Sequence, residues 1–411
     1  MRFCFAALLT FTFLAIPFPQ PAFAFEPLPF EIERDAATEG FDGDFCWFHP
    51  RAGVLPGQGE DGKNAVVMTL QKWFLSASDY FSGLSTMRTD DLGKTWTGPT
   101  ESPGLAWREE ENDITVGVCD FTPGWHAPTE TLLGVGHTVR YKDGHLMRDP
   151  RPREFAYAVF DAEEGAWAPW DIVALPDRDH YFSYGPGCAQ WLVEEDGTML
   201  VPFYHKPKDS KIYSSSVMRL TFDGEKLHVK EIGPPLDHDV PRGYYEPSLT
   251  RFQDKYYMTI RNDVRGYVSV SEDGLHFAEP KPWLFDDGEE LGSYNTQQHW
   301  VTHSDGLFLA YTRRGADNDH IMRHRAPLFI AQVDPARLCV VRETEKVLVP
   351  ERGARLGNFG VVSVNANESW VTVGEGMYGA DITESEANGR VWVSRVLWSE
   401  PNRSGLVTPP P

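Results

Sequence analysis

Four segments of this chain place arginine, histidine, tyrosine and amide side chains at the ends of expected strands. The candidate residues in them are His126, His137, Gln190, Tyr204, Arg219, Tyr244, Glu246, Arg261, Asn262, Gln298, His299 and Arg313. Histidine titrates near neutral pH and can move a proton, and arginine binds a carboxylate through paired hydrogen bonds. These residue types together can bind an acidic substrate and perform acid–base chemistry. The alternative for each residue is a structural hydrogen bond or ion pair between strands.

Metal chemistry is not expected from the sequence. His299 and His303, and likewise His320 and His324, are four residues apart, which would suit zinc on a helix but is weak evidence on strands and loops. We expect no catalytic metal and no cofactor required for the chemistry, and we leave a structural zinc or calcium ion open. The four cysteines after the leader have no CxxC spacing, so disulfides and buried thiols both remain open.

The elements that would position these residues are short strands. Asp-Gly pairs, which are typical of hairpin turns, recur at positions 143, 196, 223, 273 and 305, mostly beside β-rich runs such as 198–204 and 255–260. The segment 89–96, TDDLGKTW, reads as an Asp-box, a turn in which a hydroxyl and a carboxylate bond to backbone N–H groups, and SEDGLHF at 271–277 is a shorter variant. We assign Asp91 and Asp273 a structural role.

Strand-rich patterning with almost no helix predicts an all-β sandwich, barrel or propeller. The two Asp-boxes and the length favour a single β-propeller of seven blades, with six as the alternative, over residues 25–400. Residues 1–24 have the basic start, apolar centre and Ala-Phe-Ala end of a signal peptide, which predicts a secreted or periplasmic protein. Residues 401–411 are expected to fray.

The formal charge of −22 argues against nucleic acid or an anionic membrane as a partner. It does not exclude an acidic sugar, because cations gathered in a cleft can override the overall field. The aromatic content of 13% suits either sugar stacking or an all-β core. We expect a monomer that acts on an acidic poly- or oligosaccharide.

The stretches GVGHTVRY, YYEPSLTRFQDKYYMTIRND and SYNTQQHW, together with the Asp-boxes, resemble sialidase-superfamily propellers. The nearest likeness is to the seven-bladed ulvan lyases, the rhamnose–glucuronate lyases and related rhamnosidases. This resemblance implies a propeller that acts on a uronic-acid-containing glycan, with His and Tyr as proton carriers and Arg on the carboxylate. True sialidases carry an F-R-I-P-like motif, which Phe30–Arg34 does not match, and no acid/base aspartate is recognisable.

Three functions follow as hypotheses. The first is a polysaccharide lyase working by β-elimination, which needs a cation on the carboxylate, a base near C5 and an acid at the leaving oxygen. Its candidates are Arg219, Arg261 or Arg313 with Gln190 or Asn262 for the carboxylate, His137 or His126 as base, and Tyr204 or Tyr244 as acid. The second is an exo-glycoside hydrolase releasing sialic acid or rhamnose, in which Glu246 is the test residue. The third is a glycan-binding propeller without catalysis.

Overall fold

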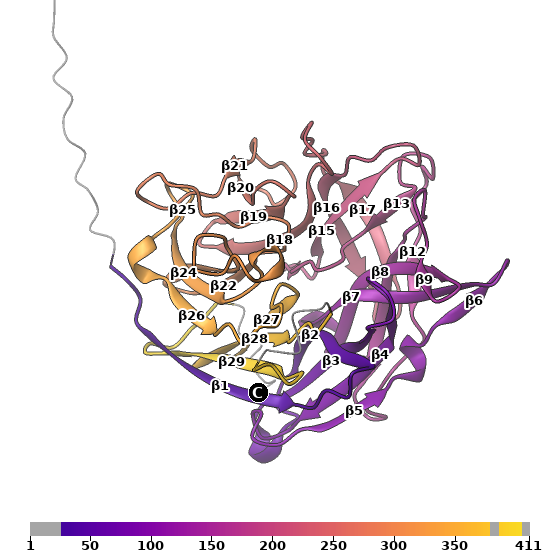
Figure 1. The fold of residues 1–411 in the computed structure, drawn as a ribbon, viewed down its shortest axis with the longest axis horizontal. Coiled ribbons are helices and arrows are strands. Elements are labelled where there is room, and N and C mark those ends of the chain that lie inside the picture. The colour runs from indigo at the N-terminus through magenta and orange to yellow at the C-terminus, as the bar shows by residue number, and fades with distance from the viewer. Residues whose placement is uncertain (1–25, 379–385, 405–411) are drawn as a thin grey trace, which may run out of the picture.

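The protein is described by a computed structural model that covers residues 26–378 and 386–404. Within these residues the strands form six antiparallel sheets, which surround a common centre as blades (Figure 1). An all-β propeller is therefore the observed fold, whereas seven blades are not confirmed. The expected leader, residues 1–24, lies outside the described residues.

The six blades follow one another along the chain. The strands of each are given from the innermost outwards, and any additional strands come last. The first is β2 (Phe45–Leu55), β3 (Ala65–Phe74), β4 (Phe81–Thr89) and β5 (Thr97–Glu101). The second is β7 (Ile114–His126), β8 (Thr131–Lys142), β10 (Phe155–Asp161) and β11 (Ala166–Trp167), with β6 (Arg108–Glu110), β9 (His145–Leu146) and β12 (Asp171–Val173) added. The third has two short inner strands, β13 (Ser183–Gly185) and β14 (Leu192–Val193), then β15 (Met199–Lys206), β16 (Ser214–Phe222) and β17 (Leu227–Ile232).

The remaining blades complete the ring. The fourth is β18 (Tyr245–Phe252), β19 (Lys255–Arg261), β20 (Tyr267–Ser271) and β21 (Lys281–Pro282). The fifth is β22 (His299–His303), β23 (Gly306–Tyr311), β24 (Leu328–Asp334), β25 (Cys339–Val340) and β26 (Lys346–Val349). The sixth is β27 (Phe359–Asn365), β28 (Glu368–Gly374) and β29 (Val391–Trp398), and its outer strand is the N-terminal β1 (Phe30–Thr38).

Helix in the described residues is confined to single 3-10 turns. They are η1 (Glu60–Gly62), η2 (Pro103–Leu105), η3 (Ala127–Thr129), η4 (Met322–His324) and η5 (Arg342–Thr344). None of them has the length and hydrophobicity to cross a membrane.

The hydrophobic core is divided among the six interfaces between neighbouring blades. Each interface has its own cluster of buried side chains; one, for example, joins Leu55 and Val67 of the first blade to Val118 and Phe160 of the second. The other five interfaces are built in the same way. Inner strands from adjacent blades also contact one another, as β2 does with β7 and β27. The faces of the sheets thus fill the ring, and the starts of the inner strands are left to line its centre.

The turn signals in the sequence locate hairpins correctly. All five Asp-Gly pairs lie in connections between paired antiparallel strands, β8–β9, β14–β15, β16–β17, β20–β21 and β22–β23. At the first Asp-box-like turn, the N–H of Gly93 donates to the Thr89 hydroxyl at 2.7 Å, and the N–H of Thr95 donates to Asp91 at 2.9 Å. The second turn repeats these bonds with Ser271 and Asp273. Both turns join the third and fourth strands of a blade, away from the centre.

Two further expectations concern the cysteines and the C-terminal tail. The four described cysteines, Cys46, Cys119, Cys188 and Cys339, are free and buried, so no disulfide joins them. In the predicted frayed tail, the described residues 401–404 are anchored. The side chain of Asn402 is fully buried, donates to the carbonyl of Thr302 and accepts from the N–H of Ser304.

The closing contact between the first and last strands can be tested at Phe30. Its ring is 6% exposed and packs edge-on against Phe308 and Trp398, at 5.4 and 5.7 Å between centroids. We expect Phe30→Ala to lower the free energy of unfolding by about 3–5 kcal/mol, measured by urea denaturation. Glu33→Ala, at an exposed position of the same strand, is the control and should change it little. Equal losses in the two variants would contradict a ring closed by this packing.

The Asp91 turn predicts a pH-dependent contribution to stability. Hydrogen bonds from Thr95, first from its backbone N–H, lower the pKa of Asp91 to about 2. Since the unfolded value is about 3.9, the contribution is full above pH ~4 and is lost as pH falls towards 2. Asp91→Ala should therefore destabilise the protein at pH 7 but much less at pH 2.5 in urea titrations. Asp239→Ala, at an exposed aspartate, is the control for the loss of one carboxylate.

Candidate functional site

Polar side chains of the inner strands and of the loops before them meet at one level of the ring. We call this region the hub; it contains Arg51, Asp120, His137, Arg153, Tyr204, Glu246, Arg261, His299 and Arg325. Three inner strands carry a β-bulge at that level, and each bulge begins with a residue in the left-handed conformation: His49, Asp120 and Glu246, with φ of 54°, 52° and 48°. Cys188 and Asn295 take the same conformation in the third and fifth blades. Non-glycine residues pay for this conformation in backbone strain, and such strain concentrates at functional sites.

Asp120 lies at the centre of the charged groups. Its Oδ1 is 3.3 Å from Nη2 of Arg51 and 3.4 Å from Nε2 of His49, and its Oδ2 is 3.4 Å from Nε2 of His137. Burial by itself would raise the pKa of Asp120, but the neighbouring His49, Arg51 and His137 outweigh it and hold that pKa well below its usual range. Asp120 is thus a fixed negative charge.

Arg51 is the least satisfied side chain of the hub. It is 1% exposed, and none of its three side-chain nitrogens makes a hydrogen bond within the described residues. A buried guanidinium usually uses several of its five N–H groups, because each unpaired donor is costly to remove from water. Its N–H groups thus make no hydrogen bond among the described residues, and Asp120 is its ion-pair partner there.

Two further arginines, Arg261 and Arg325, lie in the hub. Arg261 donates to Oε2 of Glu246 at 2.5 Å and to the side-chain oxygen of Asn295 at 2.8 Å. The backbone oxygen of Asn295 accepts from Arg325 at 2.6 Å, so one residue holds both guanidinium groups. Burial and the nearby charges of Arg261 and Arg323 lower the pKa of Arg325 to about 9. Glu246 and Asp120 keep 11% and 14% of their side-chain surface exposed, so the hub is not sealed from solvent.

Tyrosines and more cations line the side of the hub formed by the second and third blades. Tyr204 and Tyr213 are buried with ring centroids 5.3 Å apart, and Tyr245 lies 6.2 Å from Tyr204. Arg153 donates to the hydroxyl of Tyr204 at 2.6 Å. Burial raises the pKa of Tyr204 well above its usual value, which keeps this phenol protonated.

The histidines of the hub are poor free bases. Nδ1 of His137 is 3.1 Å from the Thr138 carbonyl while its Nε2 faces Asp120, so both nitrogens face acceptors. Burial, followed by the charge of Arg153, lowers the pKa of His137 to about 4. Gly187 packs against this ring, since a Cβ at that position would stand 2.1 Å from Cδ2 of His137. His299 has an unpartnered Nε2 but is 1% exposed, with Nδ1 held 2.7 Å from the Ser248 hydroxyl.

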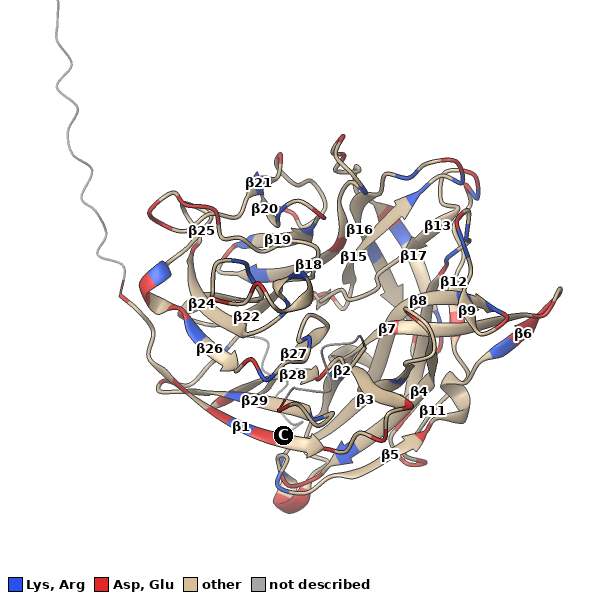
Figure 2. Ribbon diagram, viewed as in Figure 1, with Lys and Arg blue, Asp and Glu red and all other residues tan. Residues whose placement is uncertain are grey.

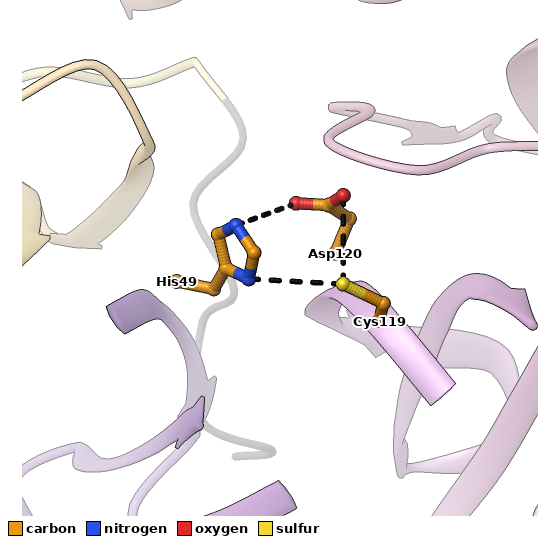
Figure 3. Close-up of side chains that lie close together, drawn as sticks. All are labelled: His49, Cys119 and Asp120. Carbon is orange, nitrogen blue, oxygen red and sulfur yellow. Dashed lines mark hydrogen bonds and ion pairs between the residues drawn. The ribbon is translucent and has the colours of Figure 1, made fainter. Parts of the chain in front are cut away.

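His49, Cys119 and Asp120 form a group of the kind that could bind a metal, the one such group among the described residues (Figure 3). The geometry does not fit a cation. The imidazole faces Cys119 with Nδ1 and Asp120 with Nε2, so one nitrogen cannot serve both neighbours. Nδ1 also lies 3.3 Å from Gln71, Nε2 lies 3.0 Å from Asn358, and the Arg51 charge stands beside the carboxylate. We therefore assign no metal-dependent reaction to this group.

Five residues expected from the sequence reach the hub. They are His137, Tyr204, Glu246, Arg261 and His299. The rings of His137 and Tyr204 are 6.3 Å apart, and the guanidinium of Arg261 is 4.7 Å from the ring of Tyr245. The clustering of histidine, tyrosine and arginine on one face is thus observed, while their catalytic roles stay predictions.

The other seven expected residues take structural places. His126 ends β7 and contacts the Gly197 carbonyl, six residues or about 20 Å of strand beyond Asp120. Gln190 pairs with the backbone of Trp300 and lines a recess of about 580 Å³ at the opposite ends of the inner strands. That recess is large enough for a ligand, but few of its polar groups lack a hydrogen-bond partner. We therefore take the hub as the candidate site. The remaining five pack or bond elsewhere: Arg219 beside Glu231 and the Asp273 turn, Tyr244 against His238 and Tyr267, Asn262 to the 241–243 loop, Gln298 to Thr259, and Arg313 to Glu345.

The sequence analysis missed several hub residues, chiefly Arg51, Asp120, Arg153 and Arg325. A signal for two of them was present: Asp120 is a charge inside the apolar run 116–123, and Arg51 follows His49-Pro50 in a buried strand. The search for an early sialidase-like motif looked at Phe30–Arg34, which the structure places in the outermost strand β1. The first inner strand is β2, and its arginine is Arg51.

Arg261, which is paired with Glu246, and Arg51, which makes no hydrogen bond, should respond differently to replacement by methionine. Arg261→Met would leave Glu246 buried without its partner, at a cost of about 3–5 kcal/mol in the free energy of unfolding. Arg51→Met removes a guanidinium that makes no hydrogen bond and leaves Asp120 facing His49 and His137, so we expect a change within about 1 kcal/mol. Urea denaturation of both variants measures the difference. Equal destabilisation would show that Arg51 is held by the protein and is not reserved for a ligand.

Solved structures with the same fold include glycan-cleaving enzymes. Trypanosoma rangeli sialidase, in complex with the inhibitor DANA, is 13% identical with a TM-score of 0.57, covering 89% of this chain and 59% of that chain. The NanB sialidase from Streptococcus pneumoniae is 9% identical with a TM-score of 0.56, covering 88% and 70%. Penicillium chrysogenum alpha-L-arabinanase, complexed with arabinobiose, is 12% identical with a TM-score of 0.52, covering 89% and 97%.

These likenesses establish the fold alone. This chain spans about three-fifths of the length of the trypanosomal sialidase. No protein-family model and no curated protein matches the sequence. The expected likeness to ulvan lyases and rhamnosidases is not shown by these structures. The chain therefore has the β-propeller fold found in sialidases and in an arabinanase.

Proposed function

We propose that this chain is a secreted glycoside hydrolase whose substrate carries an anionic sugar that binds at the hub. One observation carries the proposal: an excess of positive charge inside an acidic protein. The hub and its margin hold six buried or partly buried cations, namely Arg51, Arg151, Arg153, Lys206, Arg261 and Arg325. Three carboxylates face them, Asp120, Asp149 and Glu246.

The whole chain carries −22, and acidic segments cover outer strands such as β1 and β6 (Figure 2). A cluster of cations at the centre of such a molecule would interact favourably with an added anion. Carboxylate or sulfate groups on a sugar would accept charge-assisted hydrogen bonds from Arg51, whose N–H groups make no hydrogen bond within the described residues. The charge distribution supports an acidic glycan as the substrate.

Hydrolysis fits the side chains better than elimination through histidine. His137, expected as the base, has no ring nitrogen free of an acceptor, and His126 lies outside the hub. A hydrolase needs a negative group beside the developing oxocarbenium ion and a proton donor at the leaving oxygen. We assign the first role to Glu246. We assign the second to Asp79, which is exposed in the β3–β4 turn and whose charge influences the pKa of His49 and of Cys119.

Elimination remains the second candidate because of one tyrosine. Burial by itself would raise the pKa of Tyr213, yet Arg153 and Lys206 outweigh it and lower that pKa. A phenol whose deprotonated form is favoured in this way can serve as the general base at a carbon beside a carboxylate. The fold, shared with sialidases and an arabinanase, does not distinguish the two reactions.

Product masses and two variants distinguish the reactions. Digestion of a panel of sialylated, uronate-containing and sulfated glycans should give products heavier by one water than elimination products, with no new near-ultraviolet absorbance. Glu246→Gln should lower kcat by about 100-fold or more, and Tyr213→Phe much less. Unsaturated products together with greater sensitivity to Tyr213→Phe would establish a lyase instead. Binding without turnover across the panel would contradict both enzymes.

A further inference from the structure

The segment 147–154, between β9 and β10, brings two arginines to the margin of the hub. Arg153 is tied through its backbone to the third blade: its N–H donates to the Phe182 carbonyl, and its carbonyl accepts from the N–H of Tyr184. Arg151 stands two residues earlier, so the two side chains emerge on the same side of the extended segment. Both are partly buried.

Neither guanidinium has a carboxylate partner. Within the described residues, no Asp or Glu oxygen lies within 4 Å of either Arg151 or Arg153, although eighteen pairs between an arginine and a carboxylate occur elsewhere among them. Burial, followed by the adjacent charge of Arg153, lowers the pKa of Arg151, whereas nearby tyrosine and carboxyl groups outweigh burial and raise the pKa of Arg153. An anion between the two guanidinium groups would interact favourably with both charges.

A third cation and two phenols complete the surroundings. The ammonium of Lys206, which is 2% exposed, lies 5.2 Å from the ring of Tyr213 and 3.5 Å from Asp149, the one carboxylate nearby. Among the described residues, Lys206 thus has one carboxylate within 4 Å, whereas Arg151 and Arg153 have none. The hydroxyl of Tyr204 already accepts from Arg153, so its own proton is left to donate.

We propose that Arg151, Arg153 and Lys206, with the Tyr204 hydroxyl, form a second anion subsite for a sulfate or carboxylate on the sugar next to the one bound at Arg51. The subsite rests on the proposed function for its glycan, but anion binding itself does not require turnover. Two rings connect this subsite to the Arg51–Asp120 side of the hub. Tyr204, which bonds to Arg153, lies 6.3 Å from His137, and His137 in turn faces Asp120. A substrate with anionic groups on successive sugars would occupy both subsites.

Inorganic anions test the subsite without any substrate. In an Arg51→Met background, which removes the hub's free guanidinium, we would titrate sodium sulfate or sodium acetate at constant ionic strength and follow Tm and calorimetric binding. Sulfate stabilises proteins generally, so the signal is the difference between variants. Arg148→Gln, at an exposed arginine of the same segment, should keep the affinity, whereas Arg151→Gln and Arg153→Gln should each weaken it at least about ten-fold.

The outcomes decide both the site and its ligand. Preference for sulfate indicates a sulfate ester, and preference for acetate indicates a uronate. Saturable binding lost in Arg151→Gln and Arg153→Gln but kept in Arg148→Gln supports the subsite even if no glycan is cleaved. Equal affinity in all three variants, or no saturable binding of either anion, overturns it. Where turnover is found, Arg151→Gln should lower kcat/KM about ten-fold or more on substrates with two adjacent anionic sugars and leave those with one unchanged.

Discussion

A guanidinium buried without hydrogen bonds is the constraint on which the rest of this structure depends. Removing such a group from water costs several kcal/mol, and Asp120, at 3.3 Å, is the ion-pair partner of Arg51 among the described residues. The six inter-blade cores must supply the stability that offsets it. Each core joins two sheets through buried aliphatic and aromatic side chains, and the N-terminal strand β1 closes the last one. The ring can therefore hold an unfavourable centre.

The backbone at the centre is strained in a consistent way. His49, Asp120 and Glu246 each begin a bulge in an inner strand, and each has a positive φ that costs of order 1–3 kcal/mol. A bulge shifts the side-chain alternation, so a polar residue can turn towards the axis while its apolar neighbours remain in the blade interface. Phe121, the residue after Asp120, packs in exactly such an interface cluster. The same device thus serves packing and site geometry together.

The charge distribution connects this geometry to function. An exterior with a large negative charge opposes the approach of an anionic glycan, so the cations of the hub must act at short range, within a Debye length of about 8 Å at physiological salt. Selectivity would then come from the fit of anionic groups to Arg51 and to the arginines at the margin, rather than from long-range attraction. This favours substrates whose acidic groups are spaced to match the two clusters.

Local rules determined much of the fold, and tertiary structure decided the site. Asp-Gly pairs and the bonds of Thr89 and Asp91 depend on neighbours a few residues away, so the sequence alone located the hairpins and the all-β class. The number of blades depends on how the ring closes through β1, and sequence periodicity did not resolve it. His137, Tyr204 and Arg261 were found as candidates because they are polar residues at strand ends. His126 has the same local pattern but lies at the opposite end of its strand, and Arg51 and Asp120 look like interruptions of buried strands. Only the convergence of six inner strands, from segments up to three hundred residues apart, decides which of these charges share one centre.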